Sequence, residues 1–205
     1  MKITINNAGK RFNYEWVLKN IRYTFESGNA YAVLGPNGSG KSTLLRMIAG
    51  LLAPSTGTII YEEANHPIEV DQIFRKLSIS APYLELVEEL TLEEHFAFQQ
   101  QFKPLLHQLS IADAIAITQL KPGSSKQIRN YSSGMKQRLK VALAVLSDVP
   151  MLLLDEPTTN LDEKGVAWYV DLMKKFGGDR LIIVCSNVAR EYSFCSQKIE
   201  VLDFK

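Results

Sequence analysis

Residues 30–52 read "AYAVLGPNGSGKSTLLRMIAGLL" and join an apolar run, a glycine-rich turn and a second apolar run in one stretch. The first run is nearly continuous rather than alternating, which is typical of a strand covered on both faces in a parallel sheet. The turn satisfies the pattern G-x-x-x-x-G-K-S, from Gly35 to Ser42. The order strand, loop, helix predicts an α/β fold with a phosphate-binding loop, because loop N–H groups and a helix N-terminus both attract anions.

The side chains of this loop fit the parts of a nucleotide site. Its glycines allow the backbone to curl around phosphates. Lys41 is expected to reach the β- and γ-phosphates of ATP, and Ser42 to offer its hydroxyl to Mg²⁺. A chance glycine-rich turn is the alternative, but it does not explain the strand and the helix on either side. The predicted nucleotide-binding residues of the loop are Gly35, Pro36, Asn37, Gly38, Ser39, Gly40, Lys41, Ser42 and Thr43.

Another apolar run, "MLLLDEP" at residues 151–157, ends in two acids. Ligands of open parallel sheets bind at the carboxyl ends of the strands, so these acids are expected beside the phosphate loop. We expect Asp155 to bind Mg²⁺, directly or through water, and Glu156 to polarise the water that attacks the γ-phosphate. An Asp-Glu pair that caps a helix before Pro157 is the alternative, and it leaves the apolar strand unexplained.

Two further apolar runs, "TIIY" at residues 58–61 and "LIIVC" at residues 181–185, also predict strands. Between the strand at 58–61 and the strand at 151–155, residues 83–147 show little strand character, and the pieces at 91–102 and 132–146 have helical spacing. We therefore predict a single domain over residues 1–205, with a core at about 1–82 and 148–205 and a helical subdomain at about 83–147.

The whole chain has 205 residues and a net charge of +1, which favours one compact domain and gives no reason to expect a nucleic-acid partner. Its two cysteines, Cys185 and Cys195, lack metal-ligand spacing and are interpreted as reduced bystanders. The N-terminus has no signal-peptide pattern, and no run approaches the roughly 18 apolar residues of a membrane span. These features predict a soluble, cytosolic chain.

Three segments together resemble the ABC-type ATPases: "GPNGSGKSTLLRMIAGLLAPSTGTI", "YSSGMKQRLKVALAV" and "LLLDEPTTNLD". They occur in the order and spacing of that family, and the resemblance covers nearly the whole chain. It implies a P-loop α/β core with a mostly parallel sheet, a small antiparallel β subdomain and an inserted α-helical subdomain.

The segment at residues 131–135, "YSSGM", resembles the family's signature L-S-G-G-Q but departs from it at the first, third and fifth places. The resemblance implies that the small residues Ser132, Ser133 and Gly134 approach the γ-phosphate of an ATP held by a second ATPase chain, identical or different. A capped surface helix is the local alternative, since small hydroxyl residues also begin helices.

Two departures concern the catalytic periphery. The place of the family's loop glutamine falls at Pro82, which has no side-chain oxygen to offer Mg²⁺ or water. Asn187 stands where the family has a histidine that contacts the γ-phosphate, and an amide can donate a hydrogen bond without carrying charge. The resemblance thus implies Lys41, Glu156 and Asn187 as the catalytic set, with slow hydrolysis.

The resemblance also implies three peripheral assignments. Phe12 is the candidate that stacks on adenine, and Tyr14 is the alternative. Asp162 lies in the family's dimer-facing loop and could also cap the helix that follows. The histidines His66, His95 and His107 have no role in this picture and are each expected to be solvated.

As a whole, the resemblance implies a subunit that binds and hydrolyses ATP, dimerises around it and powers a separate membrane permease. The chain is then expected at the inner face of the cell membrane, held there by the permease, with contact near residues 83–90, "YLELVEEL". Two alternatives stay open: a nucleotide-gated binding or regulatory module with little hydrolysis, and an ABC ATPase that does not serve transport.

Overall fold

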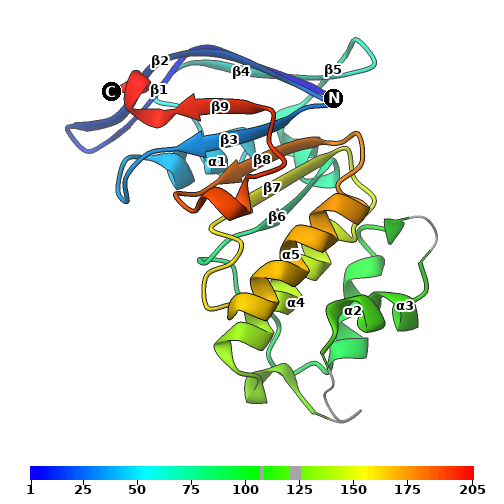
Figure 1. The fold of residues 1–205 in the computed structure, drawn as a ribbon. Helices are drawn as coiled ribbons and strands as arrows, with labels where there is room; N and C mark the ends of the chain where they lie inside the picture. Colours follow the sequence, from blue (N-terminus) through cyan, green and yellow to red (C-terminus); the bar gives the residue numbers. More distant parts are fainter. Residues whose placement is uncertain (107–108, 121–125) are drawn as a thin grey trace.

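The computed structural model describes residues 1–106, 109–120 and 126–205, and these contain two sheets (Figure 1). A five-stranded parallel sheet has the order β6-β7-β8-β3-β9, and a four-stranded antiparallel sheet has the order β2-β1-β4-β5. The parallel strands are β3 (Ala30–Leu34), β6 (Leu77–Ser80), β7 (Met151–Asp155), β8 (Leu181–Cys185) and β9 (Gln197–Glu200). The antiparallel strands are β1 (Lys2–Phe12), β2 (Glu15–Glu26), β4 (Thr56–Glu63) and β5 (His66–Ile68). The predicted α/β fold class is confirmed.

The helices lie on both faces of the parallel sheet, with α1 on the side of the antiparallel sheet and α4 and α5 on the other (Figure 1). Each of α2 to α5 begins at a polar residue whose side chain accepts a hydrogen bond from a first-turn N–H group. The helices are α1 (Lys41–Ile48), α2 (Leu92–Gln100), α3 (Ile111–Thr118), α4 (Ser133–Val145) and α5 (Glu163–Phe176). The described residues also include the 3₁₀ turns η1 (Val70–Arg75), η3 (Ile128–Asn130), η4 (Ala189–Glu191) and η5 (Val201–Phe204).

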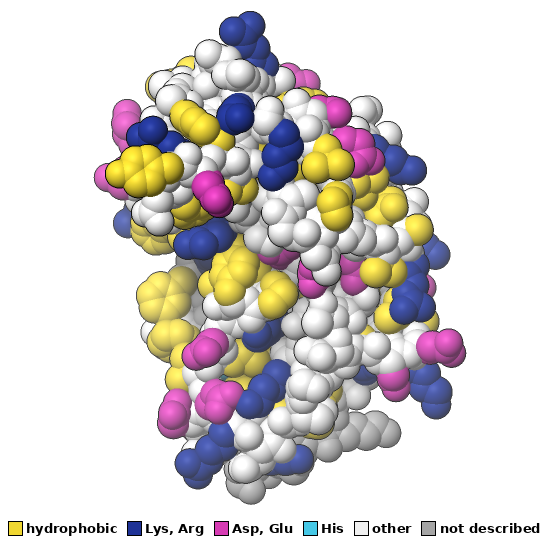
Figure 2. Space-filling model, turned by 90° about the vertical axis from the view of Figure 1, so that its left-hand side faces the viewer, with side chains coloured by type: hydrophobic (Ala, Val, Ile, Leu, Met, Phe, Trp, Pro, Cys, Tyr) yellow, Lys and Arg dark blue, Asp and Glu magenta, His cyan; other side chains and the backbone are white. Residues whose placement is uncertain are grey.

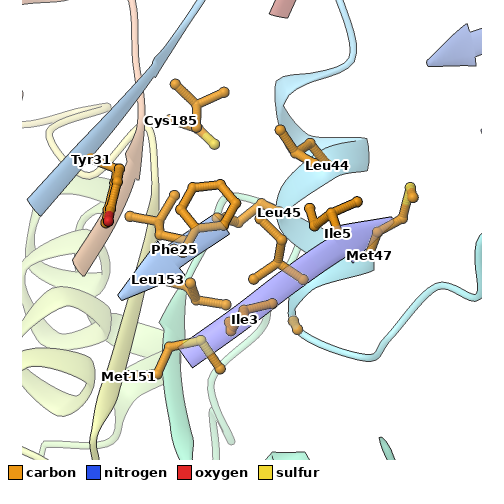
Figure 3. Packing of buried hydrophobic residues seen from close by; sticks show 14 of the residues in the cluster. Ile3, Ile5, Phe25, Tyr31, Leu44, Leu45, Met47, Met151, Leu153 and Cys185 are labelled. Carbon is orange, nitrogen blue, oxygen red and sulfur yellow. The ribbon is translucent and has the colours of Figure 1, made fainter. Parts of the chain in front are cut away.

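Two apolar clusters cover the two faces of the parallel sheet. Met151 and Leu153 of β7 point into the cluster shared with α1 and β1, which Figure 3 shows, while Leu152 and Leu154 point into the cluster shared with α2 to α5. Successive side chains of a strand face opposite sides, so a strand buried on both faces reads as a continuous apolar run. Helix α4 thus packs directly on the sheet that carries the acids, and α3 packs against α4.

The carboxyl ends of α4 and α5 are held by one side chain, Arg180. Its guanidinium donates a hydrogen bond to the Phe176 carbonyl oxygen at 2.6 Å. It also donates to the carbonyl oxygens of Val145, Ser147 and Gly177, each at 3.0 Å. Burial lowers the pKa of Arg180 to about 10. Because orphan carbonyls at helix ends need donors, this contact fixes both helices against the start of β8.

The prediction that every histidine is solvated is wrong for His95, which is buried on α2. Its Nε2 accepts a hydrogen bond from the Val87 N–H group at 3.4 Å, and burial lowers its pKa. Helix α2 packs Leu92 and Phe96 into the second apolar cluster, and His95 lies beside them. The many polar residues of this helix hide its buried face in the sequence. His66 is exposed as expected, and His107 lies outside the described residues.

The remaining whole-chain expectations concern cysteines, charge and membrane spans. Cys185 and Cys195 are both free thiols. On the face shown in Figure 2, acidic and basic side chains are interspersed, in keeping with the net charge of +1. Across residues 1–106, 109–120 and 126–205, no helix combines the length and the apolar character needed to cross a bilayer.

Candidate nucleotide site

The phosphate loop (residues 35–42) leaves the end of β3 and enters α1, as the sequence predicts. Gly35 has a φ of +143°, and a β-carbon there would lie 2.8 Å from the Ser39 Oγ atom. Gly40 has a φ of +105°, and a β-carbon there would lie 2.9 Å from a methyl carbon of Val17. Both positions therefore require glycine for conformation and for space.

Lys41 is buried within the curl of this loop. Its ammonium group donates hydrogen bonds to the carbonyl oxygens of Gly35 at 2.6 Å and Pro36 at 3.2 Å. The neighbouring Ser39 hydroxyl is buried and has no partner among the described residues. A positive charge, a free hydroxyl and the N-terminus of α1 thus face the same space, which is the chemistry that receives phosphate.

A hollow of about 290 Å³ opens over this loop, and we call it the phosphate hollow. It brings loop residues together with the acid Glu156, over 100 positions away in the sequence. Its lining residues are Val17, Asn37, Gly38, Gly40, Lys41, Ser42, Thr43 and Glu156. A larger hollow of about 660 Å³ on β1 and β2 has a single charged side chain, Arg22, which already donates to Asn7 Oδ1 at 3.3 Å, so its size alone does not make it a phosphate site.

Asp155 ends β7 as a buried acid whose two carboxylate oxygens have no hydrogen-bond partner among the described residues. Burial raises its pKa, the nearby Ser42 hydroxyl and Lys41 ammonium lower it, and Glu156 raises it further. Ser42 lies close by without completing a hydrogen bond. An orphaned buried carboxylate beside a hydroxyl fits Mg²⁺, which prefers oxygen ligands.

No group of three or more His, Cys, Asp or Glu side chains in the described part of the chain could hold a metal ion. Ser42 and Asp155 would therefore share Mg²⁺ with phosphate oxygens and water. Mg²⁺ accepts such a set because it keeps several waters and commonly binds one or two carboxylates together with phosphates.

Glu156 follows Asp155 in a strained backbone conformation, with a φ of +45°. Its N–H group donates to the Cys185 carbonyl oxygen at 2.9 Å, and its Oε2 accepts from the Thr159 hydroxyl at 3.4 Å. A non-glycine residue in the left-handed region costs on the order of 1 kcal/mol and persists only where its surroundings hold it. The half-buried carboxylate is thereby aimed into the phosphate hollow.

Asn187 lies at the rim of the same region, after β8. Its Nδ2 donates a hydrogen bond to Asn37 Oδ1 of the phosphate loop at 3.0 Å. The structure thus brings together the three residues Lys41, Glu156 and Asn187 that the sequence assigned to catalysis.

The signature segment (residues 131–135) lies elsewhere. It lines a second hollow of about 430 Å³, the signature hollow, together with Leu120, Arg138 and residues 160–162. Ser132 is exposed, and its hydroxyl accepts from the Met135 N–H group at 3.2 Å as the N-cap of α4. Within one chain, the structure does not bring Ser132, Ser133 or Gly134 into the phosphate hollow.

Gly134 has a local reason to be glycine that the sequence did not reveal. A β-carbon at this position would lie 2.9 Å from the Asn160 carbonyl oxygen, in the loop after Glu156. Asp162 of the same loop accepts from the Gly165 N–H group at 2.8 Å, so its predicted role as a helix cap is confirmed. The segment therefore packs against the loop that continues from the acid pair.

The two aromatic candidates for adenine stacking lie near the β1–β2 hairpin. Phe12 is 45% exposed and Tyr14 is 95% exposed. The Lys10 ammonium lies 5.4 Å from the centroid of the Phe12 ring. Neither ring lines the phosphate hollow, whereas Val17 of β2 does. Val17 was missed because an isolated valine in a strand carries no sequence signal for a ligand.

Pro82 is exposed after β6, and the neighbouring Tyr83 is the residue that sequence reasoning missed there. Its ring lies 5.6 Å from the guanidinium carbon of Arg46 on α1. Burial raises the pKa of the Tyr83 hydroxyl, and the charge of Asp155 raises it further while Arg46 lowers it. A polar hydroxyl next to the proline therefore lies within electrostatic reach of the acid at the end of β7.

Three comparisons agree on the kind of protein that this chain resembles. The family model described as ABC transporter matches residues 18–159. An uncharacterized ABC transporter ATP-binding protein, YybJ of Bacillus subtilis, is 34% identical over 97% of this chain and 92% of its own length. The Nod factor export ATP-binding protein I of Rhizobium johnstonii is 32% identical over 78% of this chain and 52% of its own length.

Among solved structures, a dimeric ATP-binding cassette in a post-hydrolysis state, bound to ADP and Pi, superposes with a TM-score of 0.82. It is 22% identical, over 97% of this chain and 93% of that chain, a level that supports the fold.

Proposed function

Because this chain belongs to the ABC transporter family, as an ATP-binding subunit that hydrolyses ATP to power transport, we propose that it works as one half of a pair of ATPase chains. The second chain is an identical copy or a different member of the family. Two ATP molecules would lie between the chains, each held by the phosphate loop of one and the signature segment of the other. The observation that carries this proposal is the separation of the phosphate hollow from the signature hollow within one chain.

The signature segment offers what a second chain would need. Ser132 and Ser133 are exposed at the N-terminus of α4, a helix of 13 residues whose dipole favours an anion there. In the isolated chain Ser132 caps α4, Gly134 packs on Asn160, and Tyr131 and Met135 pack on the second apolar cluster, which leaves the two serine side chains exposed. The dimeric state of the structural neighbour that holds ADP and Pi supports the same arrangement.

The hydrolytic step assigns one task to each residue in the phosphate hollow. Glu156 takes a proton from the attacking water as its oxygen bonds to the γ-phosphorus and the bond to ADP breaks. Lys41 and the loop N–H groups neutralise charge on the phosphates, and Asn187 donates one neutral hydrogen bond. When bound by Ser42 and Asp155, Mg²⁺ would neutralise charge on the β- and γ-phosphate oxygens.

Turnover should be slow because two polar groups of the family pattern are replaced. Asn187 supplies a neutral donor where a histidine could carry charge, and Pro82 supplies no oxygen. A charge-assisted hydrogen bond in the transition state is worth roughly 1 to 3 kcal/mol more than a neutral one, which corresponds to a rate about 5-fold to 150-fold lower.

The membrane permease would contact residues 83–90, where exposed acids alternate with apolar side chains. This loop is tied to the segment before the signature helix: the N–H groups of Ile128 and Arg129 donate to the carbonyl oxygens of Leu90 and Glu88, each at 2.9 Å. The Lys136 ammonium of α4 pairs with the Glu88 carboxylate. A displacement of this loop by the permease would therefore be transmitted to the signature segment.

The loop contact can be tested by co-purification with the membrane protein encoded beside this chain. Glu85→Lys and Glu89→Lys should weaken the complex, because both side chains are exposed. Glu88→Lys is the control for loop damage, since it also breaks the ion pair with Lys136. Full retention of the complex by the Glu85→Lys, Glu89→Lys double variant would contradict the contact.

We extend this proposal to location and direction. The permease would hold the chain at the inner face of the cell membrane. The relative named for Nod factor export supports outward transport, with the cargo selected by the permease.

Glu156→Gln tests the pair directly. An amide keeps the shape of the side chain but cannot accept the proton, so ATP and Mg²⁺ should capture a dimer with twice the mass of one chain in light scattering. Lys41→Ala added to Glu156→Gln is the control, because it removes phosphate binding and should return the monomer. A monomer in both cases, alone and mixed with an adjacent ATPase chain, would overturn the proposal.

A further inference from the structure

Glu191 is a charged side chain that is buried, although no sequence pattern around it predicts burial. It ends the 3₁₀ turn η4 (Ala189–Glu191), six residues after the last residue of β8, and is 2% exposed. Burial of an ionised carboxylate is costly unless donors surround it. In the described part of the chain it forms no ion pair, so its compensation comes from neutral donors.

Each oxygen of this carboxylate holds a different loop. Oε1 accepts from the Thr158 N–H group at 2.9 Å and from the Thr158 hydroxyl. Oε2 accepts from the Ser186 hydroxyl, which in turn accepts from the Val188 N–H group at 2.8 Å. The Tyr169 hydroxyl of α5 donates to the Glu191 carbonyl oxygen at 2.8 Å, and this bond ties the backbone of Glu191 to α5.

These two loops carry the groups that the proposed function assigns to hydrolysis. Thr158 lies two residues after Glu156, whose backbone is strained at a φ of +45°. Ser186 directly precedes Asn187, whose amide donates to Asn37 of the phosphate loop at 3.0 Å. Strained backbone persists only where neighbouring contacts hold it, and Glu191 accepts two hydrogen bonds from Thr158, in the loop of Glu156, in a place that water does not reach.

We propose that Glu191 is a positioning residue, which clamps the loop of Glu156 to the loop of Asn187 so that both side chains face the phosphate hollow together. The inference rests on the proposed roles of Glu156 and Asn187. Glu191 itself touches neither the nucleotide nor the attacking water; it acts through the two loops.

The chain offers a closely matched pair of variants for the test. Ser186 and Ser147 are both fully buried, and each hydroxyl donates one hydrogen bond and accepts one. The Ser147 hydroxyl donates to the Leu143 carbonyl oxygen at 2.7 Å and accepts from Gln99 at 2.9 Å, away from either loop. Ser186→Ala removes half of the clamp, whereas Ser147→Ala removes an equal number of bonds elsewhere.

Amide hydrogen exchange gives a readout that does not depend on turnover. In Ser186→Ala, exchange at Thr158 and Val188 should rise about fivefold, because about 1 kcal/mol of local hydrogen bonding is lost and opening becomes more frequent. In Ser147→Ala, exchange at these two amides should stay as in the wild type. Equal exchange in all three chains would overturn the clamp even if the chain hydrolysed no ATP.

Turnover then decides whether the clamp positions the reacting groups. Ser186→Ala and Glu191→Gln should lower kcat about 5-fold to 50-fold with ATP affinity within about twofold, since most phosphate contacts lie in the loop at 35–42. Ser147→Ala should keep the wild-type kcat. Asn187→Ala combined with Ser186→Ala should cost less than the product of the single losses, because the clamp acts through Asn187.

Two outcomes of the turnover measurement also contradict the inference and are distinct from failure of the proposed function. A wild-type kcat in Ser186→Ala, with raised exchange at Thr158, would leave Glu191 a structural residue only. Equal losses of kcat in Ser186→Ala and Ser147→Ala would attribute the effect to general destabilisation. Failure of the proposed function would appear instead as normal hydrolysis by Glu156→Gln.

Discussion

The phosphate hollow and the signature hollow differ in how complete they are within one chain. Around the phosphate hollow, Lys41, Glu156 and Asn187 converge from three separate segments, and hydrogen bonds hold each of them. The signature hollow has an exposed helix N-terminus whose described contacts serve the chain itself: a cap at Ser132 and packing at Gly134. One region is assembled by folding, and the other is an exposed surface that the proposed second chain would complete.

The small residues of the signature segment have two different explanations. Gly134 is required by the Asn160 carbonyl oxygen whether or not a second chain binds. Ser133 has no such local reason, since it is exposed in the first turn of α4. A test of the proposed contact with a second chain should therefore change Ser133 and leave Gly134 unchanged.

The largest effect is expected from Lys41→Ala. It removes the charge in the curl of the phosphate loop, so ATP binding should weaken on the order of 100-fold, with one chain as the binding unit. Isothermal titration with ATP measures this. Lys164→Ala, at an exposed lysine of α5, is the control for loss of a positive charge. Normal ATP affinity in Lys41→Ala would contradict this distinction, because the phosphate hollow would then not be the place where one chain binds ATP.

Ser133→Glu should separate the two hollows. A negative charge in the first turn suits the dipole of α4, so the melting temperature should not fall. The same charge would repel a γ-phosphate presented by a second chain, and kcat should drop more than about tenfold at full occupancy with unchanged ATP binding by the monomer.

Ser133→Gln gives the matched control for size without charge. A larger loss of turnover in the glutamate variant than in the glutamine variant would show that charge, rather than size, at this position lowers kcat. Wild-type dimerisation and turnover in Ser133→Glu would show that the signature surface does not meet the nucleotide.

A gain is expected from Asn187→His, of about fivefold to tenfold in kcat with little change in ATP affinity. An imidazole at this place could carry charge or organise the attacking water, which the amide cannot. Pro82→Gln should add to the gain if both groups act on the same water. Single-turnover hydrolysis of the four chains, with the permease present, measures both effects.

Tyr83 decides how the Pro82 result should be understood. Tyr83→Phe should leave the fold intact and lower kcat if the hydroxyl near Asp155 already serves the site. A wild-type rate equal to that of ordinary family members, with no gain from Asn187→His, would indicate that another group has replaced the histidine.

The smallest effect is expected from pH, through His95 and the loop at residues 83–90 that contacts the segment before the signature helix. Burial depresses the pKa of His95 below its ordinary 6.5, so the folded state favours the neutral ring. The unfolded chain therefore binds more protons as pH falls below about 6.5, and the stability contributed by the neutral ring is present above that pH and lost below it.

Protonation of His95 would remove the hydrogen bond from Val87, worth about 1 kcal/mol, and loosen residues 83–90. After correction for the slower intrinsic exchange at low pH, protection of the Ile128 and Arg129 amides should be lower at pH 5.5 than at pH 7.5, while protection in the phosphate loop should not change. His95→Gln should abolish this pH dependence, and His66→Gln, at an exposed histidine, should leave it intact. Equal responses in both regions would contradict the distinction between them.

The elements that the sequence predicted well are those encoded by local patterns. The strands at residues 30–34, 151–155 and 181–185 match their observed bounds, because burial on both faces of a parallel sheet requires continuous apolar runs. The helices within residues 91–102 and 132–146 follow from their caps and spacing. Strands β6 and β9 were missed because each has only 4 residues and polar positions interrupt the pattern.

The phosphate loop, the acid pair and the family could be predicted from the sequence, since backbone curl, strand burial and helix capping depend on neighbouring residues. Which distant groups meet depends on the three-dimensional packing. Asn187 reaches Asn37 across 150 positions, and Glu191 joins Thr158 across 33. Such contacts depend on the order of parallel strands and on helix packing, and no local pattern encodes them. The burial of His95 and the tight approach of Gly134 to Asn160 were decided in the same way.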